Sequence, residues 1–210
     1  MSTNSQELEQ VFSDDTYQLT GVAITKEGRL FSCYPLWPGP HRSSVKHDPS
    51  FTLIVDGKEF KKQGQPVHLQ SDGIALTPDG EWLYYKPLTD NKFYRIQTDY
   101  LRDEAFSDNQ REAAVEDLGR VAVTDGMIFD TNGNLYLGDY QNYKMVRITP
   151  EHKLEDVAAD ERLIWPDSYS ISTDDYLYIS CSQINKQPDY NEGENKRTTP
   201  YAIYRMKLPA

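Results

Sequence analysis

One short pattern occurs four times along this chain of 210 residues, and it limits the possible folds more than any other feature. Each copy has a polar residue at its first or second position, continues through alternating apolar residues to a turn, and returns through a second strand that ends in aromatic or small residues. The copies are LTGVAITKEGRLFSCYP (19–35), SDGIALTPDGEWLYYKP (71–87), TDGMIFDTNGNLYLGDY (124–140) and PDSYSISTDDYLYISCS (166–182).

The spacing of the copies indicates the architecture. Equivalent positions are occupied by Thr20, Asp72, Asp125 and Asp167, and the steps between them are 52, 53 and 42 residues. Repeats of roughly 40–50 residues made of short strands are typical of β-propeller blades. We therefore predict an all-β, propeller-like array of about four blade units.

Other segments complete the predicted blades. A third strand is predicted where YRI (94–96), VRI (146–148) and YRM (204–206) follow the second strand of a copy. Residues 99–106 and 109–117 are predicted to be helical or irregular, because they show only modest periodicity. The array is expected to form one domain, residues 17–210. A loose N-terminal segment precedes it, residues 1–16, in which residues 9–12 could pair as an outer strand.

Composition excludes several classes of function. The formal net charge of −11 argues against nucleic-acid binding, which needs clustered Lys and Arg, and it is compatible with a cationic ligand or a metal. No apolar stretch approaches the length of a membrane span. The N-terminus has neither a basic region nor an apolar region of a secretory signal, so we expect a cytoplasmic protein. Secretion is the alternative if a leader is missing.

The repeats resemble a known family. The segments SDGIALTPDGEWLYYKPL, TDGMIFDTNGNLYLGDYQN and RLIWPDSYSIS, joined to GVAITKEGRLFSCYPLWPGPHR, resemble the royal jelly protein and yellow family, whose bacterial branch is called dopachrome tautomerase-related. The resemblance covers nearly all of residues 19–185. It implies a β-propeller with six blades, which needs about 270 residues. The resemblance therefore implies that the blades between about His41 and Phe51 are missing. The remaining chain could form a compact four-unit ring, an open arc or a propeller completed by a partner, and an open arc could associate into homo-oligomers.

The residues that open the repeated strands are the candidate site. In a radial array, Asp72, Asp125 and Asp167 face one central channel, where carboxylates could hold an amine or a hard cation such as Ca²⁺ or Zn²⁺. The motifs are also similar to those of regucalcin and gluconolactonase propellers. That similarity implies metal ligands at Asp125, which matches the ligand aspartate of those propellers, and at Asp72. The position of Asp72 is commonly asparagine in those propellers. Thr20 stands where they have a glutamate, which removes one ligand. An Asp before Gly is equally expected as a structural turn residue.

Further candidates flank the repeats. Aromatic residues that could line the channel and contact a cation are Trp37, Tyr85, Tyr140 and Trp165. His41, in the loop WPGPHR, is a weak candidate for a general base. Cys33 and Cys181 occupy matching places in the first and last repeats, so a disulfide is conceivable, although two buried thiols are favoured.

Three functions remain open from the sequence. The first is a propeller that binds a small aromatic or amine metabolite in an acidic channel, with the dopachrome-type tautomerase activity that the resemblance implies. The second is a lactonase-like hydrolase that uses a metal at Asp72 and Asp125. The third is a non-enzymatic assembly protein.

Overall fold

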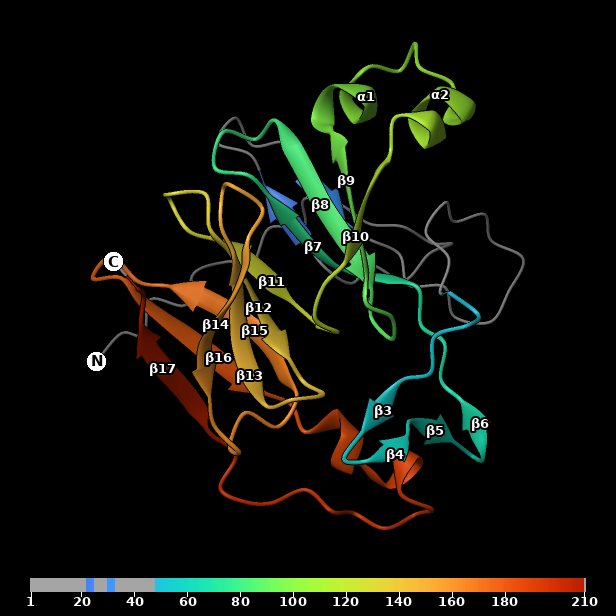
Figure 1. The fold of residues 1–210 in the computed structure, drawn as a ribbon, viewed down its shortest axis with the longest axis vertical. Helices are drawn as coiled ribbons and strands as arrows, with labels where there is room; N and C mark the ends of the chain where they lie inside the picture. The colour runs from blue at the N-terminus through green and yellow to red at the C-terminus, as the bar shows by residue number, and fades with distance from the viewer. Residues whose placement is uncertain (1–21, 25–29, 33–47, 210) are drawn as a thin grey trace, which may run out of the picture.

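The computed structural model describes residues 22–24, 30–32 and 48–209, and these residues form four antiparallel sheets arranged as propeller blades (Figure 1). The predicted propeller-like array of about four units is confirmed. The first sheet, blade 1, is the hairpin β1 (Val22–Ile24) and β2 (Leu30–Ser32). Blade 2 has the order β10-β9-β8-β7, blade 3 the order β11-β12-β13-β14, and blade 4 the order β15-β16-β17.

The strands of blades 2 to 4 follow the predicted hairpins closely. Blade 2 contains β7 (Ser71–Leu76), β8 (Trp82–Pro87), β9 (Lys92–Gln97) and β10 (Glu116–Arg120). Blade 3 contains β11 (Met127–Phe129), β12 (Leu135–Asp139), β13 (Lys144–Ile148) and β14 (Leu154–Ala159). Blade 4 contains β15 (Pro166–Ile171), β16 (Tyr176–Cys181) and β17 (Ile203–Lys207).

Two details of blades 2 and 3 differ from the sequence prediction. Two short helices follow β9, namely α1 (Thr98–Arg102) and α2 (Asp108–Ala113). The residues from Glu116 onward form the strand β10 instead of a helix or an irregular segment. A Ser107–Gln110 capping box starts α2, and this local signal can be recognised in the sequence. The strand β14 is absent from the sequence prediction, because its residues alternate only weakly between apolar and polar.

The blades meet through two apolar layers. The layer between blades 2 and 3 includes Tyr84, Phe93, Leu135 and Leu137, and the layer between blades 3 and 4 includes Tyr136, Met145, Leu177 and Ile179. Successive residues of β12 therefore point to opposite blades, and all five residues of β12 are buried. Blade 3 is the most deeply buried described sheet for this reason.

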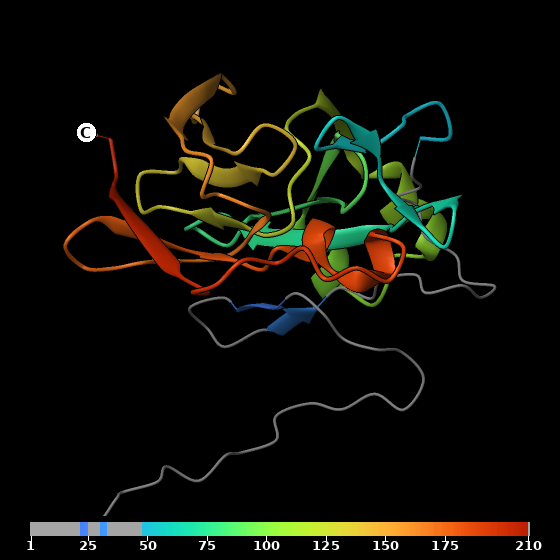
Figure 2. The ribbon, with the colours of Figure 1, turned by 90° about the horizontal axis from the view of Figure 1, so that it is seen from below.

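A small insertion covers one face of the array. It contains the hairpins β3 (Ile54–Val55) with β4 (Lys58–Glu59) and β5 (Lys61–Lys62) with β6 (Gln65–Pro66). We call residues 48–69 the cap. The 3-10 helices η1 (Ile184–Lys186) and η2 (Pro188–Tyr190) lie beside the cap in both views (Figures 1 and 2). The segment that contains η2 packs against the cap, because Tyr190 stacks on Phe60 with ring centroids 4.5 Å apart.

The inner strands touch because two glycines carry no side chain. The inner strand β7 contacts both β1 and β11, and β11 contacts β15. A Cβ atom on Gly73 would lie 2.4 Å from the carbonyl oxygen of Asp125, and one on Gly126 would lie 2.2 Å from that of Asp167. The Gly126 amide donates a hydrogen bond of 3.0 Å to the same Asp167 oxygen. The Asp-Gly pairs of the repeats therefore join neighbouring blades.

Among the described residues, no helix has the length and apolar character needed to cross a lipid bilayer.

Substituting Gly126 with alanine tests this contact. The added methyl group would force β11 and β15 apart, and we expect Gly126→Ala to lower the free energy of unfolding by about 1–3 kcal/mol. The exposed Ser170→Ala on β15 serves as the control and should change it by less than about 0.5 kcal/mol. Urea denaturation of both variants measures the difference. Equal stability of the two variants would contradict the close approach.

Candidate functional site

Three aspartates that open successive inner strands meet at the face of the array that carries the cap. Asp72 is the second residue of β7, Asp125 precedes β11, and Asp167 lies at the start of β15. All three residues are of intermediate exposure, although the carboxyl of Asp125 is itself mostly buried. The pKa of Asp125 responds to the charges of both other carboxylates, which places the three side chains in one electrostatic group. We call Asp72, Asp125 and Asp167 the carboxylate group.

Asp125 is the member with the most perturbed acidity. Burial raises the pKa of its carboxyl well above the usual range, and the negative charges of Asp167 and Asp72 raise it further. The hydrogen bond from the Trp165 indole and the charge of Lys86 act in the opposite direction. Because the raising effects are larger, Asp125 retains a proton at a pH where an ordinary aspartate is ionised.

Trp165 holds Asp125 in place. Its Nε1–H donates a hydrogen bond of 2.8 Å to Asp125 Oδ2, and the indole is 1% exposed. The ring stacks on Tyr140 with centroids 4.0 Å apart and an angle of 8° between the planes, while Phe60 of the cap packs against it at 5.2 Å. The backbone of Trp165 has φ 57°, a left-handed conformation that is uncommon for a bulky residue and is held here by this packing.

Tyr140 packs behind the carboxylate group, against Trp165. Its ring is 1% exposed, and its hydroxyl donates a hydrogen bond of 2.6 Å to the carbonyl oxygen of Leu88. Burial raises the pKa of the Tyr140 hydroxyl well above its usual range, with Asp125 as the strongest charge contribution. Tyr140 and Trp165 therefore support the carboxylate group from behind, with their ring faces occupied by other rings.

Lys86 is a buried lysine close enough to Asp72 and Asp125 to interact with their charges, and the sequence analysis missed it. Its side chain is fully buried, and Nζ donates to the carbonyl oxygens of Pro87 (2.8 Å) and Asp90 (2.7 Å). Burial lowers the pKa of Lys86 to about 7, against the charges of Asp90, Asp125 and Asp72, which raise it. A lysine within the buried strand sequence WLYYKP was the available signal, because such a position is normally apolar.

The other sequence candidates have different positions. Tyr85 stacks on Tyr94 within blade 2, with ring centroids 5.8 Å apart. Cys181 is a free thiol. The remaining candidates, namely Thr20, Cys33, Trp37 and His41, lie outside the described residues.

No metal set is assembled in the part of the chain that the structure describes. Within residues 48–209, no group of three or more His, Cys, Asp or Glu side chains is arranged to hold a metal ion. Asp125 also directs one oxygen to Trp165. We therefore derive no reaction step through a metal at Asp72 and Asp125.

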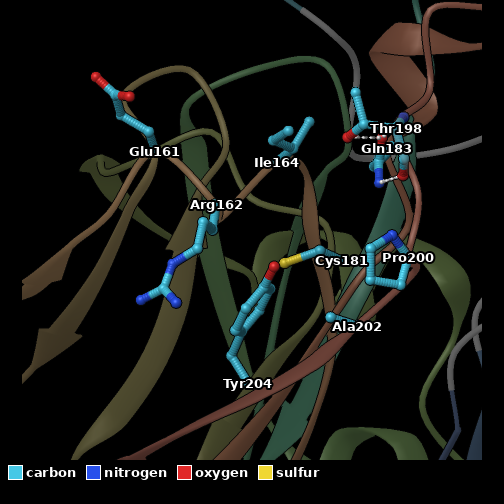
Figure 3. Close-up of a pocket in the computed structure, with 9 residues that line it drawn as sticks. All are labelled: Glu161, Arg162, Ile164, Cys181, Gln183, Thr198, Pro200, Ala202 and Tyr204. Atoms are coloured by element: carbon cyan, nitrogen blue, oxygen red, sulfur yellow. Dashed lines mark hydrogen bonds between the residues drawn. The ribbon is translucent and has the colours of Figure 1, made fainter.

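A separate pocket of about 280 Å³ lies beside blade 4 (Figure 3). Its lining residues are Glu161, Arg162, Ile164, Cys181, Gln183, Thr198, Pro200, Ala202 and Tyr204. Two of its polar side chains are already paired: Gln183 exchanges hydrogen bonds with the Thr198 backbone, and the Arg162 guanidinium binds Asp160. Burial raises the pKa of the Cys181 thiol to about 11, so the thiol is a poor nucleophile at neutral pH.

Comparison with known proteins supports the fold and identifies relatives. The chain is 26% identical over 166 residues to a 6-deoxy-6-sulfogluconolactonase of Pseudomonas putida, covering 78% of this chain and 55% of that protein. It is 30% identical over 158 residues to an uncharacterized protein of Sulfolobus acidocaldarius, covering 73% and 54%. The chain thus spans about half the length of these relatives. A solved luciferin-regenerating enzyme has a similar fold, with a TM-score of 0.54 and 14% identity over 91% of this chain and 62% of that one.

A family model described as major royal jelly protein matches residues 40–208, which include the cap and blades 2 to 4. The resemblance inferred from the repeats is thereby confirmed. Because the match extends over most of the sequence, the chain belongs to the major royal jelly protein family.

Proposed function

We propose that the protein binds a small metabolite with a protonated amine at the carboxylate group, and that Asp125 exchanges a proton with this ligand. The observation that carries the proposal is that aspartates open three neighbouring inner strands close enough for the charges of Asp72 and Asp167 to raise the pKa of Asp125, whose carboxyl is fixed by a hydrogen bond from Trp165. A positive ligand relieves the repulsion between these carboxylates, since opposite charges at short range attract strongly where water is partly excluded. The overall charge of −11 favours the approach of a cation.

The walls of the site support selective binding. Trp165 fixes Asp125 through a hydrogen bond, and the Tyr140 hydroxyl anchors the stacked pair to Leu88. Rigid support lets a binding group meet its ligand without first losing conformational freedom. The cap contributes Phe60 to the same aromatic cluster, so the cap and the carboxylate group form one packed unit.

The same arrangement suits a tautomerase. A tautomerisation moves a proton between two atoms of the substrate and needs an acid and a base but no oxidant. Asp125 with its raised pKa would donate a proton to the substrate oxygen. An ionised neighbour, Asp72 or Asp167, would accept the proton that leaves the substrate carbon, and proton exchange among the three carboxyls would then restore Asp125.

Lactone hydrolysis is the second candidate, favoured by the similarity to the sulfogluconolactonase of P. putida. In this reaction an ionised carboxylate would take a proton from water as the water attacks the lactone carbonyl. Asp125 in its protonated form would then donate a proton to the ring oxygen as the C–O bond breaks. The reaction uses the same three carboxylates, with a neutral substrate in place of an amine.

Calorimetry with dopamine, serotonin and an uncharged phenol tests amine binding. We expect saturable heat with the amines only, and a loss of affinity of about 10- to 100-fold in Asp125→Asn, because a charge-assisted contact is lost. Asp79→Asn provides the matched control, since Asp79 bonds Thr77 and the Glu81 amide in a turn. If the two variants bound the amine with equal affinity, or if the phenol also bound, the proposal that the carboxylate group binds the amine would be wrong.

Amine binding should also release protons. Asp125 retains a proton because its neighbours are negative, and a cationic ligand lowers its pKa. Titrations in buffers of different ionisation enthalpy, repeated over a series of pH values above the ordinary pKa range of an aspartate, should therefore give binding enthalpies that change with the buffer wherever Asp125 retains its proton. The Asp125→Asn variant should show a much smaller dependence at any residual binding. Identical enthalpies in all buffers for the wild type would mean that Asp125 does not exchange a proton.

A direct assay distinguishes lactonase activity from amine binding. Acid release from gluconolactone is followed at constant pH, with and without EDTA. The hydrolase function predicts a rate above the spontaneous one and a loss of at least about 100-fold in Asp125→Asn. Loss on EDTA treatment with recovery on Ca²⁺ or Zn²⁺ would indicate a metal reaction. A rate equal to that of buffer would exclude hydrolysis of this lactone.

Lys86 predicts a specific pH dependence of stability. The folded-state pKa of about 7 lies below the ordinary value of 10.5, so between these values the unfolded chain binds more protons. Stability should therefore increase with pH from 7 to 9, as the buried ammonium loses its proton. Urea denaturation across this range should show a smaller slope for Lys86→Met than for the exposed-lysine control Lys58→Met. Equal slopes would contradict the depressed pKa.

A further inference from the structure

The two hairpins of the cap have turns of the same geometry. Asp56 and Gly57 connect β3 to β4, and Gln63 and Gly64 connect β5 to β6. Both residues of each turn have positive φ, namely 55° and 70° in the first turn and 52° and 78° in the second. Aspartate followed by glycine is common in such a turn for backbone reasons, but Gln63 shows that the same turn forms with another residue. The backbone alone therefore does not require an aspartate at position 56.

The Asp56 side chain joins the cap to two blades. Asn185 Nδ2 donates a hydrogen bond of 2.8 Å to Asp56 Oδ2, and Lys186 Nζ lies 2.6 Å from the same oxygen. The Tyr143 hydroxyl donates to Asp56 Oδ1. Tyr143 belongs to the turn between β12 and β13 of blade 3, whereas η1, with the other two donors, follows β16 of blade 4. One carboxylate thus accepts from both blades, and Gln63 has no such partner in the described part of the chain.

Asn185 depends on this contact. The residue is 7% exposed, and its Oδ1 atom is buried without a hydrogen-bond partner among the described residues. Its Nδ2 atom binds Asp56. Without the Asp56 carboxylate, both polar atoms of a buried amide would lack a described partner, which is unfavourable. The position of η1 is therefore tied to that of the cap turn.

Phe60 connects the position of the cap to Trp165. The Phe60 amide donates a hydrogen bond of 2.9 Å to the Leu53 carbonyl oxygen, and its own carbonyl accepts from the Val67 amide at 3.1 Å. These bonds fix Phe60 between the two hairpins of the cap. Its ring lies 4.5 Å from that of Tyr190 in η2 and 5.2 Å from that of Trp165, measured between centroids. A shift of the cap would therefore change the packing around the Trp165 ring.

We propose that Asp56 is a positioning residue for the carboxylate group. It holds the cap against blades 3 and 4, and Phe60 of the cap then keeps the Trp165 ring in the orientation that bonds Asp125. Trp165 needs this support because a positive φ is uncommon for a bulky residue and persists only when the surroundings impose it. The inference concerns the site of the proposed function and rests on that function for its effect on ligand binding.

Hydrogen exchange of the Trp165 indole tests the inference without any ligand. Replacing Asp56 with glycine removes the carboxylate and keeps the turn, because glycine tolerates positive φ. Asp56→Gly should accelerate exchange of Trp165 Nε1–H by about 10-fold or more relative to a core amide, and the matched turn control Gln63→Gly by less than about 2-fold. The indole signal in the NMR spectrum is assigned by its absence in Trp165→Phe.

The backbone amide of Leu137 is the core reference that separates a local effect from a general loss of stability. Leu137 is fully buried in β12 and pairs with Met127 on one side and Val146 on the other. Its exchange therefore reports global unfolding. If Asp56→Gly accelerated the Leu137 amide and the Trp165 indole by the same factor, Asp56 would act only through overall stability and the inference would be wrong.

Amine binding gives the second readout. Asp56→Gly should weaken the binding of dopamine by about 3- to 30-fold relative to Gln63→Gly. In a Trp165→Phe background, Asp56→Gly should have little further effect, because the indole through which Asp56 acts is absent. Additive losses of affinity would show that Asp56 acts by another route and would overturn the inference. If the wild type bound no amine, the proposed function would be wrong, and the exchange rates would still decide the role of Asp56.

Discussion

The contact between neighbouring inner strands determines most of what this chain can do. The carbonyl oxygens of Asp125 and Asp167 lie where the preceding blade has a glycine, at 2.4 Å from a Cβ on Gly73 and 2.2 Å from a Cβ on Gly126. Such an approach is possible only without a side chain. The same contact brings the carboxylates of adjacent blades together, so the architecture and the acidic site have one cause. The backbone of the strand-opening aspartate thus makes the contact between blades, and its side chain contributes a carboxylate to the site.

The electrostatic character of the site results from what lies behind it. Lys86 is enclosed by backbone carbonyls and surrounded by carboxylates, and Trp165 reaches Asp125 from a left-handed backbone conformation. Both features are unfavourable for stability in isolation. Their cost is offset by the apolar cluster of the cap, Leu88, Tyr140 and Trp165. A strained and buried polar arrangement beside an accessible cluster of acids is characteristic of functional sites.

The blades and the strand-opening aspartates could be predicted from the sequence, but the residues packed behind the aspartates could not. Turn residues such as Pro78, with Gly80 at φ 73°, and alternating apolar residues define the hairpins locally, which is why β7, β8, β11, β12, β15 and β16 were predictable. The weakly alternating β14 depends on tertiary pairing with β13, and the same is true of β10 after its helix. The role of Trp165 was only half predicted, since the residue lies at the site but supports it instead of lining it. The burial of Lys86 required knowledge of both neighbouring blades.

The glycine contact also distinguishes blade 4 from blades 2 and 3. In blade 4 the position after Asp167 is not a glycine but Ser168, which is exposed. Its Cβ atom occupies the space that the carbonyl of a following blade would need, as the distances at Gly73 and Gly126 show. Blade 4 thus lacks, at this position, the glycine through which blades 2 and 3 approach their neighbours so closely.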